Sequence, residues 1–159
     1  MKKMLLFGVL AILAWTLPVA PAAAQIAWTK DQKALWNTEL VMGNLAVKGD
    51  YAGVIAYMDD AFENWAPQSA IPVPKEVWAK GFVNYMTHSG TKYVDFHAIP
   101  LNIWVDGNYA YVNYYSTFII SDKDGKKRAE RDRNMDVFRN KNDKWLLVAS
   151  MTMDAPKNK

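Results

Sequence analysis

The feature that most constrains the fold is a change of pattern at Thr91. Before it, apolar residues recur at helical spacing. After it, segments rich in β-branched and aromatic residues follow one another between short polar turns. Two of these turns, Asp106-Gly107-Asn108 and Asp122-Lys123-Asp124-Gly125, have the composition of β-hairpin turns. Strands joined by hairpins predict an antiparallel meander, and the preceding helices predict an α+β fold with helices on one face of a sheet.

Helix boundaries are marked in the first half of the chain. Thr29 and Gln32 form a capping box, which predicts a helix over 30–48. A second, short helix is expected at 51–58 and a third at 75–88, where Pro74 can begin the helix. A turn at Asp59-Asp60-Ala61 is expected to follow the second helix. The predicted strands are 62–65, 93–97, 101–105, 109–120, 128–139 and 145–152.

The N-terminus has the order of a signal peptide. Lys2 and Lys3 precede an apolar run over 4–17, and small residues at 22–24 precede Gln25. The sequence therefore predicts a signal peptide at 1–24, a single domain at 25–159, and a periplasmic or secreted location. The run is shorter than the roughly 20 residues of a transmembrane helix, although an uncleaved N-terminal anchor is the alternative.

Composition narrows the function of the remaining chain. The formal charge of +3 includes Lys2 and Lys3, so cleavage leaves about +1, which argues against a nucleic-acid partner. With the apolar run removed, no stable membrane insertion is expected. The absence of cysteine excludes disulfides and thiol chemistry. The 7 Trp, 8 Tyr and 6 Phe residues suit both a core and a small-molecule pocket.

Three stretches carry a resemblance to a known family. They are 49–65, which contains a double Asp before a short strand, the "V-x-G-x-x-A-x-V" turn at 105–112, and the hairpin at 133–149. Together they resemble the nuclear transport factor 2-like superfamily, especially its SnoaL-like branch. The resemblance implies a cone in which a curved antiparallel sheet packs against three N-terminal helices around a pocket. It also implies a homodimer formed through the open face of the sheet.

The same resemblance argues against one activity of the superfamily. Its isomerase branch uses an aspartate near the end of the short strand, where this chain has Asn64 or Trp65. The branch also uses a tyrosine in the first helix, where this chain has Met42 or its neighbours. Neither Asn nor Trp can act as a general base. The fold itself does not determine the function.

Asp136 is the first candidate catalytic residue. The resemblance aligns it with an acidic residue that stays protonated in an apolar pocket and donates a hydrogen bond. A one-residue shift of the strand would turn its side chain to the opposite face. In that alternative, Asp136 is a solvated acid paired with Arg133 or Arg139.

His97 and Asp60 are the other candidate catalytic residues. His97 follows Asp95 by two positions in a predicted strand, so the two side chains share a face and could exchange protons near neutral pH. A structural contact is the plain alternative for that pair, as turn formation is for Asp60. With His88 as the only other histidine and no cysteine, no transition-metal site is expected.

Four aromatic residues are expected to line a pocket for a small apolar or aromatic ligand. They are Tyr57, Trp65, Phe82 and Tyr85. The charged stretch 123–133 is expected to form a solvated hairpin with cross-strand ion pairs; anion or membrane-surface binding is the alternative. The leading hypothesis is an exported ligand-binding domain that needs no cofactor. The alternatives are a cyclase, isomerase or dehydratase that uses a pocket carboxylate, and a dimeric interaction domain.

Overall fold

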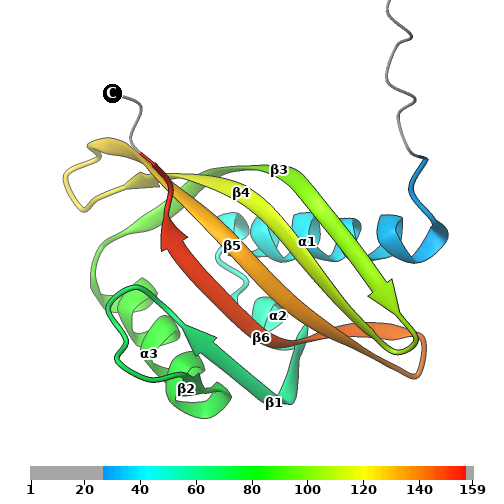
Figure 1. Cartoon of the computed structure of the whole chain (residues 1–159). Helices are drawn as coiled ribbons and strands as arrows, with labels where there is room; N and C mark the ends of the chain where they lie inside the picture. Colours follow the sequence, from blue (N-terminus) through cyan, green and yellow to red (C-terminus); the bar gives the residue numbers. More distant parts are fainter. Residues whose placement is uncertain (1–26, 157–159) are drawn as a thin grey trace, which may run out of the picture.

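The computed structural model describes residues 27–156, so the predicted signal peptide at 1–24 lies outside the described residues. None of the described helices is long and apolar enough to cross a membrane. Figure 1 shows helices packed against a curved sheet. The elements are α1 (Lys30–Lys48), α2 (Tyr51–Ile55), β1 (Met58–Trp65), β2 (Val73–Pro74), α3 (Lys75–His88), β3 (Lys92–Asp106), β4 (Tyr109–Ser121), β5 (Lys127–Lys141) and β6 (Lys144–Asp154).

The six strands form one sheet in the order β2-β1-β6-β5-β4-β3. Strands β3 to β6 pair antiparallel in sequence order, so the predicted meander is confirmed. Strand β1 then adds to β6 in parallel, which makes the sheet mixed rather than wholly antiparallel. Helix α1 packs mainly on β3, and α3 packs beside β1 and β2 (Figure 1). The predicted α+β fold class is confirmed. We call the face of the sheet that α1 covers the inner face.

Two predicted boundaries were wrong. Residues 58–61 belong to β1 rather than to a helix end and a turn, because Met58 already pairs with Leu147 of β6 and the strand continues from there to Trp65. The predicted strands 93–97 and 101–105 are one strand, β3. The register shift between Pro100 and Asn102 is an irregularity that lets a proline sit within a long strand.

The start of α1 follows the predicted capping box. The Gln32 backbone N–H donates to Thr29 Oγ1 at 3.2 Å, and the Thr29 N–H donates to Gln32 Oε1 at 2.9 Å. The Gln32 amide also donates to the Ile103 carbonyl at 2.8 Å, which ties α1 to β3. Gly49 ends the helix with a φ of 74°, a left-handed conformation that glycine adopts without strain.

The core lies between the helices and the inner face. Leu35 of α1, Phe62 of β1, Val112 of β4 and Phe138 of β5 are almost completely buried there. Helix α1 approaches β3 closely at Gly43, where a Cβ atom would overlap the Phe96 ring of β3. Burial of these apolar side chains stabilises the fold. Because the core fills only part of the space under α1, a pocket remains beside it.

Candidate functional site

A pocket of about 480 Å³ lies between α1 and the inner face of the sheet. Its size is within the range of small-molecule sites. Helix α1 contributes one wall, strands β4, β5 and β6 the other, and β1 with α3 close one side. Aromatic side chains from four elements line it: Phe62, Trp78, Phe82, Tyr93, Phe96 and Phe118.

The inner row of β5 supplies the polar wall of the pocket. Successive side chains of a strand point to opposite faces, so Glu130, Asp132, Asn134 and Asp136 share one face. All four line the pocket. Their partners in the register include Ser116 of β4, opposite Asp132, and polar residues of β6. The basic residues between them, such as Arg131 and Arg133, therefore belong to the opposite row.

Three side chains form the buried polar end of the pocket. Glu39 of α1 and Asp136 of β5 are each 3% exposed, and Tyr114 of β4 is 8% exposed. The Tyr114 hydroxyl donates to Asp136 Oδ2 at 2.9 Å. Among the described residues, Glu39 Oε1 and Asp136 Oδ1 are two buried oxygen atoms without a hydrogen-bond partner. Such unsatisfied buried oxygens are uncommon, and they mark this end as a candidate site.

Burial changes the protonation of both carboxyl groups. Desolvation raises the pKa of Glu39 well above its usual value, and the neighbouring Asp136 charge raises it further. Desolvation also raises the pKa of Asp136 to about 6, although hydrogen bonds from Ser150, Tyr114 and Glu39 oppose that rise. Of the two groups, Glu39 therefore has the stronger preference for its protonated form.

The two carboxyl groups are near enough for each to influence the protonation of the other. Two buried carboxylates repel each other when both are ionised, which favours the protonated form of one of them. A protonated Glu39 beside an ionised Asp136 avoids this repulsion. The pair then retains one negative charge in an apolar setting. Chemically, such a pair can anchor a polar group of a ligand or exchange a proton with it.

Near this pair, hydrogen bonds between side chains connect the strands that form the pocket wall. The Asn134 amide donates to Ser116 Oγ at 2.9 Å and accepts from the Thr152 hydroxyl at 3.2 Å. This ladder joins β4, β5 and β6 across the inner face. Because its groups are already partnered, the ladder shapes the wall, whereas Glu39 and Asp136 keep unpartnered oxygen atoms.

The mouth of the pocket is marked by its exposed lining residues. They include Pro67 and Gln68 of the β1–β2 loop, and Glu130 and Asp154 of the sheet. Asp132 lies between the mouth and the buried end. Its burial, and then the charges of Glu130 and Asp154, raise its pKa to about 6. Three acidic residues therefore line the pocket at and near its mouth.

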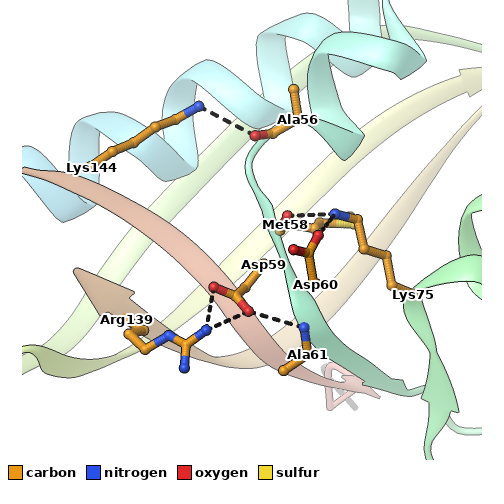
Figure 2. A network of polar contacts seen from close by, with 8 residues as sticks. All are labelled: Ala56, Met58, Asp59, Asp60, Ala61, Lys75, Arg139 and Lys144. Carbon is orange, nitrogen blue, oxygen red and sulfur yellow. Dashed lines mark hydrogen bonds and ion pairs between the residues drawn. The ribbon is translucent and has the colours of Figure 1, made fainter. Parts of the chain in front are cut away.

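A second carboxylate network lies at the start of β1, away from the pocket. Figure 2 shows Arg139 of β5 facing Asp59, with Nη2 at 2.6 Å and 2.7 Å from the two carboxylate oxygens. The Ala61 N–H also donates to Asp59 at 3.0 Å. The Arg139 contact lowers the pKa of the buried Asp59. This network ties β1 to β5 across the intervening strand β6, which is a structural role.

The structure places the three candidate catalytic residues in different surroundings. Asp136 lies in the pocket rather than on the solvated face. The Asp60 side chain is 95% exposed and lies 3.4 Å from the Lys75 amine (Figure 2). The His97 side chain is 70% exposed and lies 2.9 Å from Asp95. Neither Asp60 nor His97 lines the pocket, so neither can act together with Asp136.

The four aromatic residues expected to bind ligand also separate. Phe82 lines the pocket, whereas Tyr57, Trp65 and Tyr85 do not. Trp65 and Tyr85 are exposed, and the Trp65 indole donates to the Ser69 carbonyl at 3.0 Å. Tyr57 packs on the core beneath the Lys144 amine. These three residues do not line the pocket because β1 and α3 direct other aromatic side chains toward it, namely Phe62 and Trp78.

Sequence reasoning did not identify Glu39 or the acidic row of β5. Glu39 has helical spacing from Leu35, Met42 and Ala46, so the helical pattern places a carboxylate on an apolar face. In β5, acidic and basic residues alternate with the period of a strand, which separates them onto two faces. Both signals were present in the sequence.

Comparisons with known proteins agree on the fold. No known family profile matches the sequence, and no curated protein matches it. Among solved structures, a ketosteroid isomerase-like protein from Erwinia carotovora atroseptica superposes with a TM-score of 0.68 at 13% identity. The match covers 82% of this chain and 100% of that one. At this identity, the similarity establishes the fold alone.

Two further structures extend the agreement. An NTF2-like protein of unknown function from Prochlorococcus marinus has a TM-score of 0.67 at 13% identity, with 82% of this chain and 97% of that chain covered. The association domain of calcium/calmodulin-dependent kinase II from C. elegans has a TM-score of 0.61 at 14% identity, with coverages of 77% and 94%. The fold of this protein is therefore the NTF2-like cone.

Proposed function

We propose that this protein binds a small, mainly apolar ligand in the pocket under α1. The observation that carries the proposal is the buried Glu39–Asp136 pair, which has unpartnered oxygen atoms and lines a pocket of about 480 Å³. Unpaired buried polar groups cost stability, so they are usually retained where they meet a partner. The surrounding aromatic side chains provide apolar contact area for the rest of the ligand.

Mass spectrometry of the protein under native conditions tests the proposal. We expect a bound small molecule that is lost in the Ser116→Phe variant, because Ser116 is buried in the pocket wall and the larger ring would fill the space. Thr117→Phe is the matched control, since Thr117 is the next residue of β4 and does not line the pocket. Equal ligand retention by both variants would contradict binding in this pocket.

Proton transfer on the bound ligand is a second candidate function. The observation that favours it is the carboxyl pair itself, in which Asp136 has a pKa of about 6 and Glu39 has a higher one than usual. A group that titrates near neutral pH can act as a general acid or base. Hydrogen–deuterium exchange of small ketones in heavy water, followed by NMR, tests this function. Asp136→Asn should abolish any exchange that the protein catalyses.

Self-association through the outer face of the sheet is also proposed. Exposed apolar side chains gather there: Ile99 and Leu101 of β3, Met135 of β5 and Met153 of β6. Leu101, Met135 and Met153 also line a shallow groove on this face. The structural similarity to a kinase association domain supports a second copy of this chain as the partner.

Export from the cytoplasm is proposed from the sequence of the N-terminus. Lys2, Lys3, the apolar run and the small residues at 22–24 are the support. Intact-mass analysis of the protein from a periplasmic fraction tests it, with a mature chain beginning at Gln25 as the expected result. A full-length chain in the membrane fraction would instead favour the uncleaved anchor.

A further inference from the structure

We infer that the pocket selects organic cations, namely ligands that carry a protonated amine on an apolar body about the size of one or two rings. This inference rests on the proposed function and specifies its ligand. It follows from the charges of the lining residues, from the depth at which two of them are buried, and from the aromatic surfaces between them.

The lining residues carry charge of one sign only. Within the described range 27–156, the pocket is lined by five acidic residues and by no lysine, arginine or histidine: Glu39, Glu130, Asp132, Asp136 and Asp154. Arg128 pairs with Glu130 at 2.9 Å, so one of these charges has a cationic neighbour at the mouth. The remaining acids have no basic partner within the pocket. The field there attracts cations and repels anions.

The buried end strengthens this preference. Asp136 is 3% exposed, and the Tyr114 hydroxyl donates a hydrogen bond to it, but no basic side chain among the described residues lines the pocket to balance its charge. A buried charge is costly unless it is paired. The unpartnered oxygen atoms of the two carboxyl groups can each accept a hydrogen bond. A protonated amine supplies both the positive charge and the donor hydrogens that this end lacks.

The aromatic walls suit the same class of ligand. The rings of Trp78 and Phe82 are stacked with centroids 4.8 Å apart, and Phe118 contacts both Tyr93 and Phe96 across the pocket lining. Ring faces attract cations and also pack against apolar bodies. Acidic and aromatic residues together therefore recognise the two parts of an apolar amine.

The arrangement favours an organic cation over a metal ion. Nowhere between residues 27 and 156 do three acidic or histidine side chains come together in a group that could hold a metal. The acids are instead distributed along the pocket from Glu39 at the buried end to Asp154 at the mouth. A distributed set of charges matches an extended ligand.

Isothermal titration calorimetry with three probes of the same shape tests the inference at pH 7.4. The probes are 2-naphthylmethylamine, which is cationic, 2-naphthylmethanol, which is neutral, and 2-naphthoate, which is anionic. We expect the amine to bind at least tenfold more tightly than the alcohol, and the carboxylate to bind least. This order supports the inference.

The outcomes separate the inference from the function on which it rests. Binding of the alcohol as tight as that of the amine would overturn the cation inference and leave ligand binding in the pocket intact. If none of the probes binds at millimolar concentration, both the inference and the proposed pocket function fail for ligands of this size.

Variants in which one acidic residue is replaced by asparagine test whether the pocket acids cause the preference for the amine. Asp132 lies in the pocket wall, and Asp132→Asn should weaken amine binding about three- to tenfold more than it weakens alcohol binding. Asp143→Asn is the matched control, because Asp143 is exposed in the β5–β6 turn and its φ of 60° suits asparagine. Circular dichroism verifies that each variant is folded. Equal effects of the two substitutions would overturn the assignment to the pocket acids.

Discussion

At the scale of single residues, the two carboxylate networks have opposite effects on pH dependence. Burial of Glu39 and Asp136 raises their pKa values, whereas Arg139 lowers the pKa of Asp59. A raised carboxyl pKa means that the folded chain binds protons more tightly than the unfolded chain. A lowered pKa means the reverse. Near neutral pH, the buried carboxyl groups of the pocket therefore lower the free energy of unfolding. The Asp59–Arg139 network raises it.

The pocket network predicts that stability falls as pH rises. Between the ordinary pKa of an aspartate, 3.8, and the value of about 6 for Asp136, the folded chain holds the extra proton, so the free energy of unfolding decreases with pH across this window. The decrease for one group is of order 1 to 3 kcal/mol. Asp136→Asn should flatten it, although Asp132 titrates in the same range.

Urea denaturation from pH 4 to pH 8 measures this dependence. Asp143→Asn, in an exposed turn, should retain the slope of the parent protein. An unchanged slope in Asp136→Asn would show that Asp136 is not the group that titrates.

The β1 network predicts a contrast between two adjacent acids. Asp59→Asn should destabilise the protein by about 1 to 3 kcal/mol at pH 7, because it removes the buried charge that Arg139 binds. Asp60→Asn should change stability by less than about 0.5 kcal/mol, since Asp60 is fully solvated beside Lys75. Chemical denaturation of both variants measures the difference. Equal losses would contradict the assignment.

The contribution of Asp59 should also depend on pH in a defined direction. Its folded pKa is depressed, so the stability it contributes is fully present above the unfolded value of about 3.8 and is lost as pH falls through the lower folded value. The difference between Asp59→Asn and the parent should therefore shrink at strongly acidic pH.

At the scale of elements, the approach of α1 to β3 limits what can replace Gly43. Alanine normally stabilises a helix interior by about 0.5 to 1 kcal/mol relative to glycine. At position 43, however, a Cβ atom would overlap the Phe96 ring, which lines the pocket. We expect Gly43→Ala to destabilise the protein by about 1 to 3 kcal/mol and to displace Phe96.

Gly81→Ala provides the matched control for this prediction. Gly81 lies in α3, where a Cβ atom would meet nothing within 4 Å. That substitution should stabilise the protein by the usual helix preference of alanine. Thermal denaturation of the two variants should give changes of opposite sign; a gain in both would mean that Phe96 moves aside at no cost.

The strands differ in how far the sequence specified them. The hairpin turns fixed the ends of β4 and β5 closely, because glycine and aspartate adopt the dihedral angles that such turns require. Strand β3 was predicted as two strands, since a proline commonly ends one. The irregularity at Pro100 kept the pairing with β4 on both sides. Pairing with a neighbour thus overrode the local signal.

At the scale of the whole molecule, the outer face of the sheet predicts self-association. We expect the parent protein to be a dimer at micromolar concentration. Leu101→Lys should convert it to a monomer, because a charge would be buried in the apolar contact. Val77→Lys, at an exposed apolar residue of α3, should leave the dimer intact. Light scattering after size exclusion measures the mass; a parent protein that is already monomeric would contradict the proposal.

The sequence by itself determined the local structure: the cap at Thr29, the three helices, the alternating strands and the hairpin turns. These depend on dihedral preferences and on spacing within a few residues, which are properties of neighbouring positions. It also led to the α+β class, because helices followed by hairpin-linked strands have few ways to bury their apolar faces.

The tertiary structure alone decided that β1 joins β6 in parallel and that Glu39 meets Asp136. It also decided that His97 and Asp60 remain in solvent. These outcomes depend on register and on the position of α1 over the sheet, where a shift of one residue would turn Asp136 away from the pocket. The sequence therefore identified a carboxylate of the site, whereas its partner, its protonation and the acidic wall around it come from contacts between distant elements.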